Sequence, residues 1–100
     1  MKEIINSQFN PSDYTVVVVD FWADWCMPCK MLLPILEKLS GEFTSITFLK
    51  ANVEENTELA KQHSVSGIPT MLVFKDGQLV NKIVGLQREA GLREILQKLV

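Results

Sequence analysis

Apolar residues cluster in several runs along this chain, and most of these runs have the pattern of buried strands. The runs at 15–22 and 45–53 are rich in β-branched and aromatic residues and alternate little with polar ones. Such a pattern is typical of central strands that are covered on both faces of a sheet. A further run at 70–74 and a short apolar segment at 2–5 predict two more strands.

Helical spacing of apolar residues appears between residues 28 and 42. The residues that recur there at intervals of three and four are Leu32, Ile35, Leu36 and Leu39. This spacing predicts an amphipathic helix, and Gly41 predicts its end. Pro34 lies inside the pattern, where it should remove one backbone hydrogen bond and kink the helix.

Two shorter helices are expected later in the chain. Asn56 precedes the segment 57–63 and is a residue type that often caps a helix N-terminus. Residues 88–99 form an amphipathic pattern, although Gly91 and the lack of a good capping residue weaken its start. The turn-rich segment 6–14 has room for at most a turn or two of helix.

The turn at Asp76 and Gly77 fixes how the last strands pair. Asp-Gly between the runs at 70–74 and 78–84 is a strong signal for an antiparallel hairpin. The earlier strands are joined by helices, so they must be parallel. The sequence therefore predicts an α/β fold, in which helices cover both faces of a central mixed β-sheet that ends in a C-terminal antiparallel hairpin.

Composition excludes several classes of protein. The 100 residues are 47% hydrophobic and 22% charged with a net charge of −2, which suits one globular domain over residues 1–100. No basic stripe interleaves with aromatic residues, so we expect no nucleic-acid partner. No apolar run approaches the ~20 residues that span a bilayer, and the first residues lack a secretory h-region. We therefore expect no membrane association and a cytoplasmic location.

The only two cysteines, Cys26 and Cys29, lie three positions apart directly after a predicted buried strand. A zinc site would need about four ligands, and His63, which we expect at the surface, is the only other soft candidate. A metal site within one chain is therefore not expected. If the two cysteines formed a purely structural disulfide, closing so short a loop would add only about 2 kcal/mol to the stability of the fold.

A redox pair fits the spacing better than either alternative. If Pro28 occupies the first helical turn, Cys26 lies at the helix N-terminus and Cys29 one turn further, on the same side. Free backbone N–H groups and the helix dipole then favour the thiolate of Cys26. This geometry makes Cys26 the attacking sulfur and Cys29 the resolving thiol.

Three motifs resemble those of the thioredoxin family. They are "VDFWADWCMPCK" around the cysteines, "GIPT" at 67–70 and "FKDGQLV…IVG" over the hairpin, and the resemblance extends over nearly the whole chain. It implies a thioredoxin fold and an enzyme that reduces protein disulfides. It also implies that Asp20 is a general acid/base, that Lys50 is its buried partner, and that the Ile68–Pro69 bond is cis.

The resemblance further implies a flat apolar surface around Cys26 that contacts substrates. Its residues would be Trp25, Met27, Pro28, Gly67, Ile68, Pro69, Gly85 and Leu86. Met27 departs from the family, which has glycine there, and should affect partner choice. The segment before the first valine is also a few residues shorter than usual.

The implied partners are protein disulfides and a thioredoxin reductase, a flavoenzyme linked to NADPH or ferredoxin. We expect a monomer without a bound cofactor. One alternative is an oxidase or isomerase that uses the same chemistry. The other is a binding subunit that has a thioredoxin fold and no catalytic role, because a fold alone does not fix function.

Overall fold

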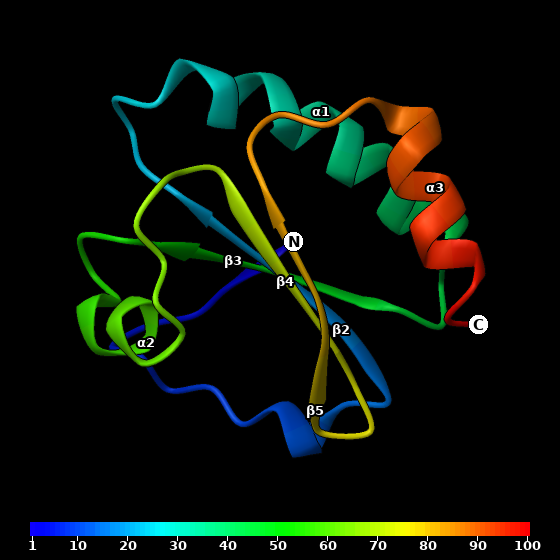
Figure 1. Ribbon diagram of the computed structural model, residues 1–100, viewed down its shortest axis with the longest axis horizontal. Coiled ribbons are helices and arrows are strands. Elements are labelled where there is room, and N and C mark those ends of the chain that lie inside the picture. The colour runs from blue at the N-terminus through cyan, green and yellow to red at the C-terminus, as the bar shows by residue number, and fades with distance from the viewer.

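One five-stranded sheet organises the computed structural model, which describes all residues from 1 to 100 (Figure 1). The strands are β1 (Lys2–Glu3), β2 (Val16–Trp22), β3 (Thr47–Asn52), β4 (Thr70–Lys75) and β5 (Gln78–Val84). The helices are α1 (Met27–Glu42), α2 (Thr57–Gln62) and α3 (Glu89–Gln97), with a single 3-10 turn at Pro11–Asp13.

The strand order is β1-β3-β2-β4-β5. β3 is parallel to both β1 and β2, whereas β4 is antiparallel to β2 and to β5. The predicted mixed sheet and C-terminal hairpin are therefore confirmed. None of the helices is long and apolar enough to cross a membrane.

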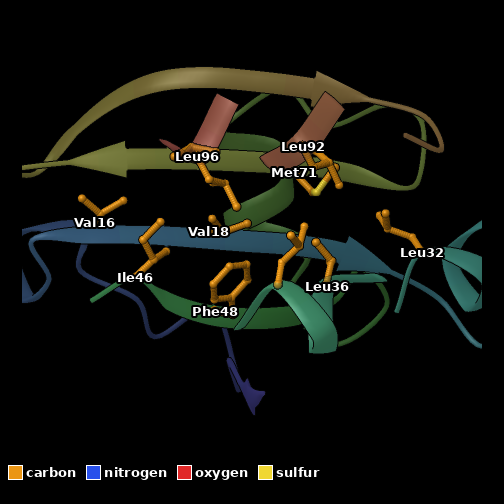
Figure 2. Close-up of a cluster of buried hydrophobic side chains, with 11 residues drawn as sticks. Val16, Val18, Leu32, Leu36, Ile46, Phe48, Met71, Leu92 and Leu96 are labelled. Atoms are coloured by element: carbon orange, nitrogen blue, oxygen red, sulfur yellow. The ribbon is translucent and has the colours of Figure 1, made fainter. Parts of the chain in front are cut away.

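Strand β2 lies at the centre of the sheet and sends alternate side chains to opposite faces. Val16 and Val18 point to the face that α1 and α3 cover, where they join a core cluster with Leu36 and Phe48 (Figure 2). Val17, Val19 and Phe21 point to the other face, where α2 packs. Because both faces are covered, β2 needs apolar residues at consecutive positions, which explains its unbroken valine run.

The same alternation places Asp20 on the α1 face of the sheet. Asp20 lies two residues after Val18, so the two side chains point the same way. Its neighbours across the sheet are Lys50 on β3 and Met71 on β4. A carboxylate therefore lies on the buried face of the central strand, near the end of β2 that leads to α1.

The first helix ends where it was predicted to end, since α1 stops at Glu42, one residue after Gly41, and is capped by Phe43, whose N–H donates to the Leu39 carbonyl. Two local expectations need correction. β1 covers only half of the predicted segment 2–5. His63 is half-buried and not at the surface, since its ring lies edge-on to Phe74 at 5.5 Å between centroids.

Asn56 precedes α2 as predicted, but its side chain does not cap that helix. Instead Oδ1 accepts a hydrogen bond from the N–H of Ser7 at 2.8 Å. Its amide nitrogen donates to the carbonyls of Ile4 and Asn52, each at 3.0 Å. This fully buried amide therefore ties the N-terminal segment to the loop after β3.

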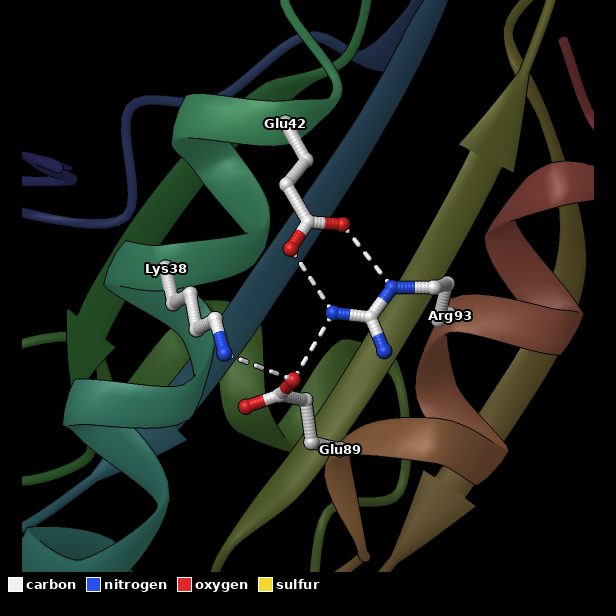
Figure 3. A network of polar contacts seen from close by, with 4 residues as sticks. All are labelled: Lys38, Glu42, Glu89 and Arg93. Carbon is white, nitrogen blue, oxygen red and sulfur yellow. Dashed lines mark hydrogen bonds and ion pairs between the residues drawn. The ribbon is translucent and has the colours of Figure 1, made fainter.

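A network of charged side chains joins α1 to α3 (Figure 3). The Arg93 guanidinium donates to both carboxylate oxygens of Glu42 and to Glu89, while Lys38 pairs with Glu89 at 3.1 Å. The hydrogen bonds from Arg93 hold the pKa of both carboxylates below the usual range. The network fixes the start of α3, and with it the loop that leads there from β5.

Candidate active site

The two cysteines lie where β2 gives way to α1. A tight turn follows β2, in which the Cys26 N–H donates to the Ala23 carbonyl at 3.1 Å. Cys26 then occupies the N-cap of α1, and Pro28 lies in the first helical turn as predicted. Proline suits this position because its missing N–H would have no partner there.

Cys26 and Cys29 form a disulfide whose Cα atoms are 5.3 Å apart. The Cys29 N–H also donates to the Cys26 sulfur at 3.2 Å, so this sulfur acts as the side-chain cap of the helix. An N–H donor and the positive end of the helix dipole both stabilise negative charge at that point. The sulfur of Cys26 is therefore placed where a thiolate is favoured over a thiol.

The loop before β4 packs against the cysteine pair. The Ile68–Pro69 peptide bond is cis, as the family resemblance implies, and Ile68 contacts the small cluster of Ala23, Cys26 and Cys29. The Gly85 N–H donates to the Pro69 carbonyl at 2.8 Å. Gly85 has φ +92, a conformation that favours glycine, so the loop after β5 can turn back towards the cis-proline.

The exposed residues beside the disulfide are mostly large and apolar. Cys26 itself is only 5% exposed, whereas Trp25 is 68%, Met27 64% and Leu86 42% exposed. Exposed apolar side chains that gather around a reactive group are typical of a site that binds other molecules. Pro28 and Gly67 are also exposed, while Ile68 is half-buried and Pro69 is buried.

A small cavity of about 80 Å³ lies beneath the disulfide. It is lined by Asp20, Trp22, Cys29, Lys30, Leu33 and Lys50. Asp20 Oδ1 and Trp22 Nε1 are both buried and have no hydrogen-bond partner in the protein. The cavity therefore brings the buried carboxylate and the inner cysteine together around unsatisfied polar atoms, which water could bind.

Burial dominates the electrostatics of Asp20. Its side chain is almost inaccessible, and loss of hydration raises its pKa to about 7, against a smaller opposing effect of the Lys50 charge. A carboxyl group that titrates near neutral pH can both accept and donate a proton under ordinary conditions. This property suits a general acid/base.

Lys50 differs from the buried partner that was expected. Its side chain is 25% exposed, and it forms no ion pair with Asp20. Its ammonium lies instead 5.3 Å from the centroid of the Trp22 ring and 3.9 Å from a carboxylate oxygen of Glu3. Lys50 therefore acts on Asp20 only through its charge at a distance.

Sequence reasoning missed some of the cavity wall. Trp22 is half-buried and lines the cavity, although no role at the site was predicted for it. Lys30 and Leu33 were not expected at all. A signal existed, because Trp22 follows Asp20 by two residues in a strand, and Leu33 follows Cys29 by one helical turn.

A mixed sheet that carries a C-x-x-C pair at a helix N-terminus beside a cis-proline defines a class of dithiol oxidoreductases. The thioredoxin family model matches residues 2–98. Thioredoxins of Staphylococcus epidermidis and Staphylococcus aureus are each 49% identical over 84 residues, covering 83% of this chain and 81% of theirs.

Solved structures agree with this match. Mitochondrial thioredoxin 3 of Saccharomyces cerevisiae, in its oxidised form, is 34% identical with a TM-score of 0.91, covering 98% of this chain and 94% of its own. The thioredoxin of Plasmodium falciparum is 32% identical with a TM-score of 0.89, covering 98% of this chain and 98% of its own.

The chain belongs to the thioredoxin family. With its cysteine pair at disulfide distance, it is a thiol–disulfide oxidoreductase that reduces protein disulfides by exchange at Cys26 and Cys29. The similarity to thioredoxins does not favour an oxidase or isomerase, and it does not favour a binding subunit without catalytic activity. The family and the site thus agree on the reaction.

Met27 occupies the first position of α1, so its replacement by glycine should have a small effect on stability. Glycine loses more backbone entropy on folding, and Met27→Gly should lower the free energy of unfolding by about 0.5–1 kcal/mol. The reduction potential should move by no more than about 30 mV, because the helix N-terminus is unchanged. Urea unfolding and equilibration with glutathione measure the two quantities. A much larger shift in potential would show that Met27 tunes the redox chemistry.

Proposed function

We propose that Cys26 is the attacking thiol and Cys29 the resolving thiol in protein disulfide reduction. The observation that carries this assignment is the hydrogen bond from the Cys29 N–H to the Cys26 sulfur at the N-cap of α1. It stabilises negative charge on one sulfur only. Cys29 lies inside the first turn of α1 and lines the cavity, and its sulfur accepts no such hydrogen bond.

The proposed reaction has two exchange steps. The Cys26 thiolate attacks one sulfur of the substrate disulfide, forms a mixed disulfide and releases the other substrate sulfur as a thiolate. Cys29 then loses its proton and attacks Cys26, which releases the second substrate sulfur and forms the Cys26–Cys29 disulfide. The substrate gains two electrons, and the protein dithiol loses them.

Asp20 is proposed to accept the proton of Cys29 in the second step. Both residues line the cavity, whose volume of about 80 Å³ exceeds the ~10–15 Å³ that one water needs. Water there would bridge the free Oδ1 to the inner thiol. Lys50 would assist by favouring the ionised carboxylate from a distance.

The apolar surface around Cys26 is proposed to bind the substrate near its disulfide. The exposed side chains of Trp25, Met27 and Leu86 would make apolar contacts. The backbone of Ile68, next to the buried Pro69, would pair with an extended substrate segment, as in strand addition. Pro28, Gly67 and Gly85 complete this surface, and none of them has a bulky side chain that would obstruct a close approach.

A thioredoxin reductase is proposed as the partner that returns electrons to the Cys26–Cys29 disulfide. It would be a flavoenzyme that draws on NADPH or ferredoxin, and protein disulfides would be the substrates. The protein would act as a monomer, one substrate at a time. A reducing role also suits the cytoplasm, where thiols are kept reduced.

Asp20→Asn should slow the release of reduced substrate by about a hundredfold near pH 7, because asparagine cannot accept the proton of Cys29. The deficit should shrink towards pH 9, where a thiol ionises without help. Stopped-flow measurement of substrate release across this range tests the role, with Asp24→Asn as an exposed control. A deficit of constant size from pH 6 to pH 9 would remove Asp20 from proton transfer.

A further inference from the structure

An open groove of about 370 Å³ runs beside the active site, between α1 and the loop that joins β5 to α3. Met31 and Ile35 form its wall on α1, one helical turn apart. Leu86, Gln87 and Arg88 form the opposite wall. The proposed reaction uses only Leu86 among these five residues.

The groove is continuous with the surface around Cys26. Met27 and Met31 lie on the same side of α1, and they are 64% and 55% exposed. Leu86 belongs to both regions. The loop wall is held in place, because the Gln87 amide donates to the carbonyls of Val84 and Gly85. Exposed apolar side chains therefore continue from the surface around Cys26 into the groove.

Arg88 gives one wall of the groove a free positive charge. It is exposed, and it takes part in none of the ion pairs of the protein. The two cations that bridge α1 and α3, Lys38 and Arg93, are already paired with Glu89 and Glu42. No carboxylate of the protein pairs with the Arg88 guanidinium, so its N–H donors are available to a partner.

We propose that this groove is a substrate subsite for an aliphatic side chain followed by a carboxylate. The aliphatic group would lie between Met31 and Leu86, and the carboxylate would pair with Arg88. From Met27 to Met31 and Ile35 the helix advances about 6–12 Å, at about 1.5 Å per residue. An extended substrate covers this distance in about two to four residues, counted from the attacked cysteine.

This inference rests on the proposed attack by Cys26, and short peptides can test the two separately. Each peptide has one cysteine in a mixed disulfide with a chromogenic aromatic thiol. Leucine stands three residues before or three residues after that cysteine, followed by glutamate or by lysine, and a third set has serine in place of leucine. The low-molecular-weight disulfide of hydroxyethanethiol serves as a substrate that is too small to reach the groove.

The reduced protein should react with the Leu-Glu peptide about two- to fivefold faster than with the Leu-Lys peptide, in at least one of the two placements. It should favour Leu-Glu over Ser-Glu by about fivefold. The charge preference should weaken as salt is added. Equal rates for all peptides, with normal turnover of the small disulfide, would overturn the subsite and leave the proposed function intact.

Arg88→Glu should reverse the charge preference, and Lys98→Glu provides the matched control. Lys98 is exposed at the far end of α3 and its substitution changes net charge equally. Met31→Ser should remove the preference for leucine. An Arg88→Glu protein that still prefers Leu-Glu would contradict the proposal. So would a preference that disappears as protein concentration rises, because a second copy of the chain would then occupy the groove.

Discussion

Cys29→Ser should accumulate substrate proteins as stable mixed disulfides, because the thiol that resolves the intermediate is gone. The Cys26 thiolate still lies at the N-cap of α1, so the first exchange still occurs. Catalytic turnover of protein disulfides should fall by at least about a thousandfold, the scale on which removal of an essential group usually acts. Non-reducing electrophoresis of the variant, mixed with a reducible protein such as insulin, shows the adduct.

The reciprocal variant is the control for this prediction. Cys26→Ser retains a thiol at position 29, but this thiol lies inside the first turn of α1 and lacks the N-cap contact. It should lose turnover to the same degree and form almost no adduct. Equal trapping by the two variants would overturn the assignment of attacking and resolving thiols.

Asp20→Asn should gain stability over wild type as the pH rises. The difference between the two free energies of unfolding should be larger at pH 8 than at pH 4, by at most about 4 kcal/mol. Burial raises the pKa of Asp20 from 3.8 to about 7 in the folded protein. Below pH 4 the carboxyl is protonated in both the folded and unfolded states, and it contributes no difference. As pH rises from 4 to 7 the unfolded chain releases the proton first, so the folded state loses stability. Above pH 7 the loss is complete.

Urea unfolding at a series of pH values measures this effect. The wild-type free energy of unfolding should decline between pH 4 and pH 7, and in Asp20→Asn this component should be absent. Asp24→Asn, which changes an exposed carboxylate nearby, should keep the wild-type slope. Parallel pH profiles for wild type and Asp20→Asn would show that the buried carboxylate does not carry the cost that its surroundings predict.

The sequence predicted elements whose signal is local. The valine run of β2 predicts a buried strand and the Asp76-Gly77 turn predicts a hairpin, each from a few neighbouring residues. Both elements are present in the structure. The C-x-x-C pair is likewise located by its own neighbours, since proline at position 28 favours the first turn of a helix. Short sequence segments were therefore sufficient to predict the central strand, the hairpin and the position of the cysteine pair.

Features that depend on distant residues were not predictable. The Asn56 side chain bonds to Ser7 and Ile4, about fifty positions away, and so does not cap its own helix. Arg93 meets Glu42 across a similar separation. No periodicity in a single sequence encodes such pairs, because they arise only when separate elements pack together.

The cavity beneath the disulfide and the groove beside it were not predictable either, because each forms only when separate elements pack together. Roles for Asp20 and Cys29 were predicted, but the cavity that both residues line forms only because α1 packs against β2. The groove at Met31 and Leu86 needs α1 and the loop after β5 to lie side by side. Leu86 was predicted as a contact residue from the sequence, but its position in a groove with Met31 was not predictable.

The measurement that tests the central claim most directly is the reduction potential of the Cys26–Cys29 pair. The purified protein is equilibrated with defined mixtures of reduced and oxidised glutathione, and the oxidised fraction is read by thiol alkylation and mass spectrometry. A protein disulfide reductase should have a reduction potential of about −270 mV, as thioredoxin has. A value between about −120 and −180 mV, the range of disulfide oxidases and isomerases, would contradict it.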